Sequence, residues 1–545
     1  MISRARAYPG AAAALFGALT ALYANLVTKG LTFEVKYSLY RDLADFYWVQ
    51  AFVDKGLFPR DPIVAFLSAH VNRFSPWAGI CFTSLFMHPH PYTIGLKALS
   101  VLACTLASFM FYRMAAGPAA RPAAVTAGVL FVPYFLSQNL FFGAPRVYGG
   151  LLLLAFLWAA ESGSFLLLPV ISAASLVFYT PNSLSMALSC LLAPLFYRAA
   201  FSERRLLPRY LAIAATSAAV CLSAFLYNPA MRGLLRGLRA GSGFEDSRLY
   251  QFVTTPVHPG NLMDMLFYFY LNINEHSRLY PVMSALLLAL FALGWYVRRG
   301  APKLLPRSVL MALAASTAAF LLSYPVHVVS AARQTVFIVP LVLVFLAAEG
   351  IDRFSGGKPR IAVLAVASAT LFALLHPWLN EIVSVRTYSA AYGYISRLKG
   401  DVLLAGHPES LLTATIPVFS QRSVLVADDL RDQYELHLSS REAFSARRAA
   451  LLAALYSDSP SKACALRSVY GVDYLVLEDR YFSQDHFAML ARSGFPLNEE
   501  ISRAIAASPD PRGFYSYAKR RAAFSWKDAE SGGVIFDLSL CGARP

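Results

Sequence analysis

Long apolar runs separated by short polar links fill the first two thirds of the chain. A helix that crosses a bilayer needs about 20 mostly apolar residues, and on that criterion the pattern predicts about eleven transmembrane helices. The predicted spans are residues 9–29, 91–113, 122–141, 147–160, 164–180, 183–199, 208–227, 281–297, 307–326, 334–350 and 360–378.

The links between these spans alternate in charge. Every second link is short and rich in Lys and Arg, which is typical of the cytoplasmic side. The first run follows Arg4 and Arg6, so we interpret it as a retained helix that starts in the cytoplasm. An odd number of spans then places the C-terminal part outside the cell. The basic links hold Arg113 and Arg121; Arg198, Arg204, Arg205 and Arg209; Arg298, Arg299, Lys303 and Arg307; and Arg353, Lys358 and Arg360.

The predicted outer segments are residues 30–90, 142–146, 228–280 and 327–333. Two of them, 30–90 and 228–280, hold nine of the 13 acidic residues that precede residue 381. Residues 34–55 carry many aromatic side chains, which favour the membrane interface. We therefore predict that residues 34–55 form a helix lying on the outer leaflet.

The pattern changes after about residue 380. Short apolar runs at residues 402–405, 423–427, 474–477 and 533–538 predict strands, and residues 441–456 and 461–470 predict helices. Alternating short strands and helices favour an α/β layer domain. The predicted fold class is therefore an α-helical polytopic membrane domain, residues 1–380, followed by an extracytoplasmic soluble α/β domain, residues 381–545.

Composition agrees with this division. The chain is 57% hydrophobic and only 15% charged. Residues 381–545 hold 19 basic and 19 acidic residues, so the whole net charge of +16 lies in the apolar part. A basic excess between apolar runs indicates membrane topology and lipid headgroups, and no basic stripe with interleaved aromatics favours nucleic acid. Cys464 and Cys541 can pair only if the C-terminal domain faces an oxidising compartment.

One acidic pair stands out as candidate chemistry. Asp42 and Asp45 are three residues apart, so on a helix both carboxylates share one face. At an interface of low dielectric constant, a paired acid can act as a general base. The alternative interpretation is the solvated face of an amphipathic helix.

Four basic residues near the predicted outer ends of spans are candidate phosphate ligands. Arg146, Arg278 and Arg333 can each form paired hydrogen bonds with a phosphate. Lys97 is a weaker candidate, and for each of the four the alternative is contact with lipid headgroups. Phosphate-binding glycine loops and dinucleotide fingerprints do not occur in the sequence, so no nucleotide cofactor is expected.

Four stretches resemble the GT-C superfamily of polytopic glycosyltransferases, which use lipid-phosphate-linked sugars. The first runs from Asp42 to Tyr47 and continues in Gly56-Leu-Phe-Pro-Arg-Asp61-Pro62. The second is residues 332–340, which begin Ala-Arg333-Gln and end at a proline. The third is the last span leading into an outer domain. The fourth is a pair of phrases in that domain, residues 416–426 and 470–477.

The resemblance implies a specific chemistry. The donor is a polyprenyl-phosphate sugar in the outer leaflet of a bacterial cell membrane, and the acceptor is a hydroxyl of a glycan, lipid or protein. Asp45 is the favoured base, and Asp42 assists or helps to hold a divalent cation. Arg333 stabilises the leaving phosphate, with Arg146, Arg278 or Lys97 in support, and the sugar carbon is inverted.

Two other functions are compatible with the sequence. One is a transporter or flippase for a lipid-linked saccharide, which usually carries ionisable residues at mid-membrane and repeated halves. The other is a non-catalytic membrane assembly protein. Acids that cluster at the predicted outer surface, without a sequence repeat, favour the enzyme.

Overall fold

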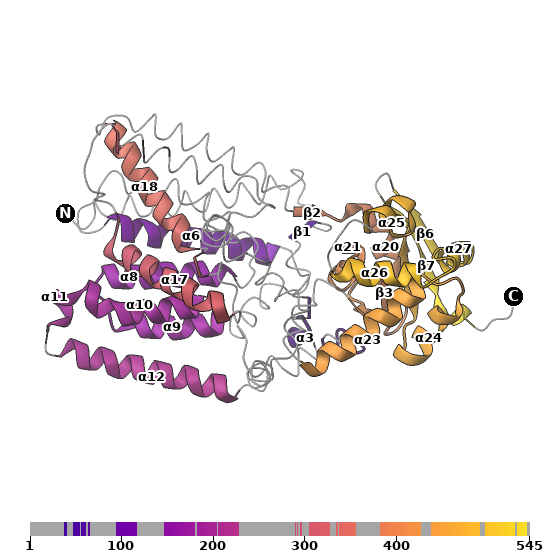
Figure 1. Ribbon diagram of the computed structural model, residues 1–545, viewed down its shortest axis with the longest axis horizontal. Helices are drawn as coiled ribbons and strands as arrows, with labels where there is room; N and C mark the ends of the chain where they lie inside the picture. Colours follow the sequence, from indigo (N-terminus) through magenta and orange to yellow (C-terminus); the bar gives the residue numbers. More distant parts are fainter. Residues whose placement is uncertain are drawn as a thin grey trace.

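The computed structural model consists of a group of apolar helices and an α/β part (Figure 1). Predicted spans 9–29, 122–141 and 360–378 lie outside the residues that the structure describes. The described residues are 38–40, 47–48, 50–54, 56–61, 64–65, 94–116, 146–179, 182–203, 205–227, 289, 292, 295–296, 305–326, 334–335, 337–355, 382–426, 438–490, 496–528 and 531–541.

The apolar helices occupy seven of the predicted spans, with ends that agree to within a few residues. Their hydrophobic composition accounts for them, because an all-round apolar helix is stable only when buried in protein or in lipid. The helices are α6 (Ile94–Ala116), α8 (Arg146–Glu161), α9 (Leu167–Phe178), α10 (Ser183–Phe196), α11 (Arg198–Phe201), α12 (Leu206–Tyr227), α17 (Arg307–Val326) and α18 (Ile338–Ser355).

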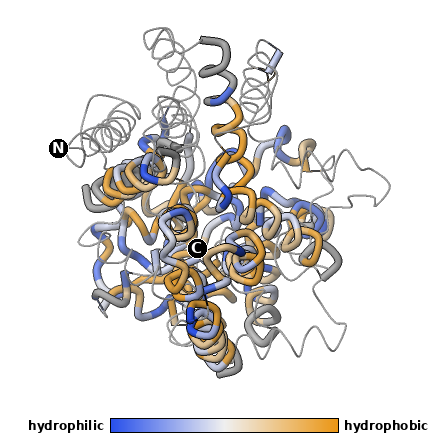
Figure 2. The backbone as a smooth tube through the Cα atoms, turned by 90° about the vertical axis from the view of Figure 1, so that its left-hand side faces the viewer, coloured by the Kyte–Doolittle hydropathy of each residue, from blue (hydrophilic) through white to orange (hydrophobic). Residues whose placement is uncertain are grey.

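These helices pack around a shared core of small and aromatic side chains. Phe111 of α6 stacks on Phe345 of α18 with ring centroids 5.1 Å apart. Small buried residues such as Ala312 and Ala315 let α17 approach α10 closely. In Figure 2, which views the molecule from the end that holds α11, hydrophobic positions make up most of the helical turns.

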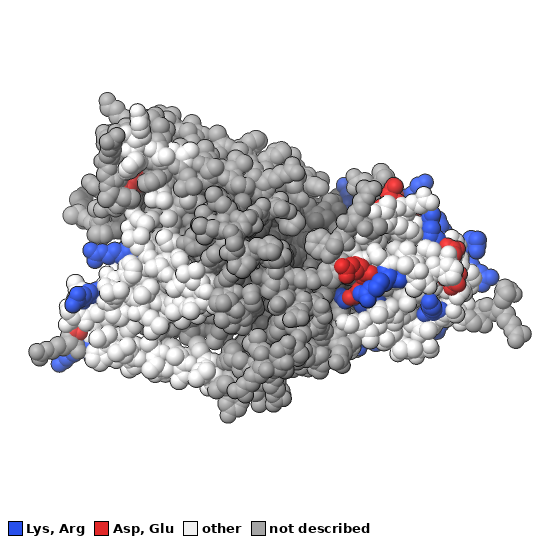
Figure 3. Space-filling view, viewed as in Figure 1, with Lys and Arg blue, Asp and Glu red and all other residues white. Residues whose placement is uncertain are grey.

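The described parts of two basic links predicted for the inner side meet at one end of the helices. Glu161, after α8, accepts hydrogen bonds from the Tyr197 hydroxyl at 2.9 Å and from the Ser308 backbone N–H at 2.7 Å. Arg198 and Arg307 are exposed beside these contacts. On the face shown in Figure 3, described Lys and Arg gather at this end and on the α/β part. Arg198 and Arg307, from two of the predicted basic links, therefore lie at the same end of the described helices.

One described helix has the length and composition to cross a membrane. This segment, Leu206–Ser223 in α12, is 6% buried. Further apolar helices of 10–17 residues occur in α6, α8, α9, α10, α17, α18 and α21.

The C-terminal part is an α/β layer, as the sequence predicts. Its strands are β3 (Leu403–Gly406), β4 (Ser423–Val424), β5 (Tyr474–Glu478), β6 (Phe524–Lys527) and β7 (Gly532–Asp537). The helices are α20 (Ser389–Ser396), α21 (Leu411–Ser420), α23 (Leu438–Leu455), α24 (Ser461–Tyr470), α25 (Gln484–Leu490), α26 (Pro496–Ala506) and α27 (Gly513–Arg520), with 3-10 turns η7 (Arg386–Tyr388), η9 (Asp479–Phe482) and η10 (Leu538–Leu540).

The sheet has the strand order β4-β3-β5-β7-β6. β3 is parallel to both neighbours, and β7 and β6 continue the sheet antiparallel. The chain leaves β3 through α21 to reach β4 on one side, and returns through α23 and α24 to reach β5 on the other. The carboxyl ends of β3 and β5 therefore meet where the strand order reverses, which is where open α/β sheets bind ligands.

A disulfide joins Cys464 of α24 to Cys541, with Cα atoms 5.4 Å apart. It ties the last strand of the sheet back to the helix that precedes β5. The structure therefore makes the pairing that the sequence left open.

The prediction of a single helix over residues 34–55 is wrong for the described part. Ser38–Tyr40 form a strand, β1, and only Gln50–Val53 form an α-helix, α3. β1 pairs antiparallel with β2 (Ile382–Ser384), at the start of the α/β part. Tyr47 and Trp48 are fully buried in the core of that part rather than lying on a lipid surface.

Candidate functional site

The predicted catalytic pair lies between two segments that the α/β part holds in place. Asp42 and Asp45 are outside the described residues, as are Arg278 and Arg333. The chain before them is fixed by the pairing of β1 with β2, and the chain after them by the burial of Tyr47 and Trp48. The described residues on either side of this pair are therefore both held by the α/β part.

The second anchor depends on a buried carboxylate, Asp61, which is 0% exposed. Its Oδ2 accepts hydrogen bonds from the Tyr47 hydroxyl at 2.8 Å and from the Val424 backbone N–H at 3.2 Å. Its Oδ1 accepts from the Val64 backbone N–H at 3.2 Å. A buried charge needs such partners to be tolerated. Asp61 thus joins the first outer segment to strand β4.

The neighbouring residue makes a second link. Arg60 Nη1 donates to the Asp473 carboxylate at 2.7 Å and to the Asp401 carbonyl at 2.8 Å, and its Nη2 donates to the Gly471 carbonyl. Gly471 ends α24 with φ +71°, a conformation that favours glycine. A side chain there would also meet the Arg60 guanidinium, because a Cβ would lie 2.9 Å from Nη2.

Backbone strain marks the same segment. Phe58 has φ +58°, which is unusual for a bulky residue. Its ring is buried and packs edge-on to Tyr47 at 5.3 Å. Such strain persists where surrounding contacts over-determine the conformation. The segment 56–61 therefore has a fixed shape against the α/β part.

These contacts unite stretches that are far apart in the sequence. Residues 56–61 belong to the first stretch that carries the GT-C resemblance. Val424 lies in one of the two α/β phrases, and Gly471 and Asp473 lie in the other. The two phrases of the α/β part are thus where the first outer segment docks.

Two of the predicted phosphate ligands occupy the first turns of adjacent helices. Lys97 is in the first turn of α6, and Arg146 begins α8. α6 and α8 pack together, and Phe109 and Trp158, near their C-terminal ends, are in edge contact at 6.3 Å. The two helices therefore run in the same direction, and their first turns share one end.

The segment that follows Arg333 reaches the same end of the helices. Asn182, before α10, donates to the Gly149 carbonyl in the first turn of α8 at 3.0 Å. Tyr179 packs edge-on against Phe337 at 5.8 Å, just after the buried Gln334. In α6, Leu99 of the first turns joins the core of the α/β part. This end of the helices therefore faces the α/β part.

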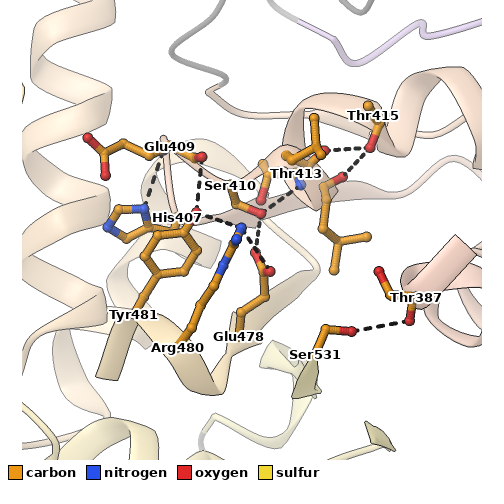
Figure 4. Close-up of polar contacts among 12 residues, drawn as sticks. Thr387, His407, Glu409, Ser410, Thr413, Thr415, Glu478, Arg480, Tyr481 and Ser531 are labelled. Atoms are coloured by element: carbon orange, nitrogen blue, oxygen red, sulfur yellow. Dashed lines mark hydrogen bonds and ion pairs between the residues drawn. The ribbon is translucent and has the colours of Figure 1, made fainter. Parts of the chain in front are cut away.

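A second polar cluster, which the sequence did not predict, lies at the carboxyl ends of β3 and β5 (Figure 4). His407 follows β3 directly, and Ser410 begins α21 by accepting a hydrogen bond from the Thr413 N–H at 3.0 Å. The Ser410 hydroxyl also donates to Glu478, the last residue of β5. Gly406 allows this approach, because a Cβ there would lie 2.2 Å from the Thr413 hydroxyl.

Burial changes the proton affinity of this cluster. Glu478 is 3% exposed, and its burial raises the pKa of its carboxyl, an effect opposed by Arg480, 3.2 Å from Oε2. Burial, with the nearby His486 and Arg480, lowers the pKa of His407 well below its usual value. Burial and Arg480 also lower the pKa of His486. Both imidazoles are therefore neutral at physiological pH.

Aromatic contacts hold the cluster in place. The His407 ring stacks on Tyr481, with ring centroids 3.8 Å apart. The Tyr481 hydroxyl donates to the Glu409 carbonyl at 3.0 Å, and Arg480 donates to that hydroxyl at 2.8 Å. The position of His407 immediately after a predicted strand was the signal that sequence reasoning missed.

Comparisons with known proteins find likeness in structure only. No protein-family model matches the chain, and no characterised protein matches it in sequence. Solved structures of the oligosaccharyltransferase AglB from Archaeoglobus fulgidus resemble it at 12% identity. The form with an inhibitory peptide and a dolichol-phosphate gives a TM-score of 0.47, covering 91% of this chain and 72% of that one. The form without ligands gives 0.48, covering 90% and 72%.

Proposed function

We propose that the protein is an integral membrane glycosyltransferase of the GT-C type, which moves a sugar from a polyprenyl-phosphate donor to an acceptor hydroxyl on the outer face of the membrane. The observation that carries this proposal is the docking of residues 56–61 on the α/β part. Together with the pairing of β1 and β2, it holds the described segments before and after Asp42 and Asp45 against the α/β part. Lys97 and Arg146 lie in first turns at the end of the helices that faces this part.

The surface of the helices supports the membrane location. Leu191 and Leu195 of α10 are 75% and 70% exposed, and Val220 and Leu222 of α12 are 60% and 58% exposed. Exposed apolar surface of this extent is costly in water and is stable against lipid. The bilayer covers these side chains in the proposed arrangement.

The disulfide supports the orientation. Disulfides persist in oxidising compartments and are rare in the cytosol. A bond between Cys464 and Cys541 therefore favours an α/β domain outside the cell membrane. Arg198 and Arg307, exposed at the opposite end of the helices, favour the same orientation, because Lys and Arg are enriched on the cytoplasmic side.

The proposed reaction is a single displacement. Asp45 removes the proton of the acceptor hydroxyl, whose oxygen forms a bond with the anomeric carbon as the bond from that carbon to the phosphate oxygen breaks. The leaving polyprenyl phosphate takes the negative charge, which Arg333 stabilises with help from Arg146, Arg278 or Lys97. Attack from the side opposite the phosphate inverts the sugar carbon.

Each catalytic group should make a contribution of known magnitude to the reaction rate. General-base assistance contributes about 10²–10⁴-fold to a rate. Removing one preorganised donor from a developing anion typically costs about 10²–10³-fold. Asp42 assists Asp45 or shares a divalent cation with it. No nucleotide is required, because the donor already carries the phosphate that leaves.

The test is mass spectrometry of cell-surface glycans and lipid-linked saccharides, with and without this protein. We expect that loss of the protein removes one sugar from a surface glycan, lipid or protein and that the polyprenyl-phosphate sugar accumulates. Restoring the wild-type chain should reverse both changes. Unchanged glycans together with an unchanged donor pool would contradict the proposal.

A further inference from the structure

The polar cluster at the carboxyl ends of β3 and β5 contains a set of metal-ligand side chains. His407 follows β3, Glu409 lies two residues further on, and His486 is in α25. Each offers one ligand atom, and these atoms all lie within 4.8 Å of one another. The three residues come from two segments that meet at the reversal of the strand order.

One nitrogen of each histidine has no hydrogen-bond partner. Nε2 of His407 and Nε2 of His486 are both buried and form no hydrogen bond. A buried polar atom without a partner costs free energy, so such an atom points to a ligand or an ion. His407 Nδ1 accepts only a long hydrogen bond of 3.3 Å from the Glu409 N–H.

The surroundings suit a cation despite the nearby guanidinium. Arg480 is engaged by the buried Glu478 carboxylate at 3.2 Å, which offsets its charge. The Glu409 side chain is exposed, so it can rotate toward the histidines.

We propose that His407, His486 and Glu409 bind a divalent metal of the zinc type. Two imidazole nitrogens and one carboxylate form a ligand set that zinc prefers, and three protein ligands leave a fourth position for water or a ligand oxygen. Bonds of about 2.0–2.2 Å place tetrahedral ligands about 3.4 Å apart. The ligand atoms therefore need to move closer to one another by about 1.4 Å at most. The proposed site uses neither Asp42 nor Asp45 and does not depend on glycosyl transfer.

The test is isothermal titration of Zn²⁺ into the full-length, tag-free protein in detergent after treatment with a chelator. We expect one equivalent of saturable binding that depends on His486 and Glu409. His486→Ala and Glu409→Gln should each weaken it, His486→Ala by about 100-fold or more, since changes beyond the ligands already cost about 10–100-fold. Glu203→Gln, an exposed acid at the other end of the molecule, should bind as the wild type does.

Co²⁺ absorption gives a second readout that does not require catalysis. A tetrahedral site should produce intense visible bands in the wild type that His486→Ala lacks. His486 is half-buried, so the melting temperature of the metal-free variant should be measured beside that of the wild type. Absence of saturable Zn²⁺ binding to the wild type, or unchanged affinity in both His486→Ala and Glu409→Gln, would overturn the proposal.

Discussion

Asp61 shows how a single side chain can hold the segment 56–61 against the α/β part. Its carboxylate is fully buried, so it loses its contacts with water. Hydrogen bonds from Tyr47, Val64 and Val424 offset this loss. Hydropathy patterns do not report whether an acid is buried. The sequence therefore directed attention to Asp42 and Asp45, and only the structure shows that Asp61 positions the segment after them.

Replacing Asp61 should loosen this link. Asp61→Ala removes the acceptor of three buried donors, and each donor left without a partner costs about 1–3 kcal/mol. Asp61→Asn keeps one acceptor oxygen and should cost less. Thermal unfolding of the purified variants should show this order, with Asp54→Ala, an exposed acid of the same segment, close to the wild type. An unchanged midpoint in Asp61→Ala would show that the carboxylate does not hold the segment.

Glu478 predicts a pH dependence of stability. Burial raises the pKa of its carboxyl above the usual 4.5, so the folded protein holds this proton more tightly than the unfolded chain does. The resulting stabilisation is fully present below about pH 4.5 and is lost as pH rises through the folded-state pKa. Glu478→Gln removes this pH-dependent contribution to the free energy of unfolding.

The check is thermal unfolding of the wild type and of Glu478→Gln from about pH 4.5 upward. The stability of the wild type relative to the variant should be greatest at the acidic end and should decline as pH rises. A relative stability that increased with pH would mean that Arg480 stabilises the ionised carboxylate more than burial penalises it.

At the scale of elements, local patterns predicted well where the interactions are local. The apolar runs gave α10, α12 and α17 within a few residues, and α24 was predicted with the bounds observed. The strands β3 and β5 were predicted from short apolar runs. β6 was missed because its four residues alternate too briefly to distinguish a strand.

The failure at residues 34–55 has a different cause. Aromatic residues at the start of a membrane protein resemble an interfacial helix, but β1 pairs with a strand more than 300 residues later in the chain. Pairing over such a distance leaves no periodic signal within a single segment. The aromatic side chains of Tyr47 and Trp48 serve to fill the core of the α/β part.

The disulfide is an element-scale feature with a measurable contribution. It closes a loop with a sequence separation of 77, and disulfides typically stabilise by about 2–4 kcal/mol. The double variant with Cys464→Ser and Cys541→Ser should unfold at a lower temperature, and reductant should lower the midpoint of the wild type but not that of the variant. Cys221→Ser, at a free cysteine, is the control. A wild-type midpoint insensitive to reductant would indicate that the bond contributes nothing.

At the scale of the whole molecule, the proposed topology has the α/β domain outside the cell and the basic links inside. Protease added to intact spheroplasts should digest the region after about residue 385 and leave the basic links protected, because the proposed topology puts the α/β part outside and the basic links inside. Permeabilised cells provide the control for protease access. Protection of the C-terminal region in intact spheroplasts would reverse the topology.

The central claim is that a carboxylate of residues 41–46 removes the acceptor proton. The direct measurement is sugar transfer by the purified protein from a synthetic polyprenyl-phosphate sugar, comparing wild type, Asp45→Asn and the control Asp54→Asn. We predict that Asp45→Asn lowers the transfer rate by about 10²–10⁴-fold with folding intact, and that Asp54→Asn does not. Transfer at the wild-type rate by Asp45→Asn would contradict the account.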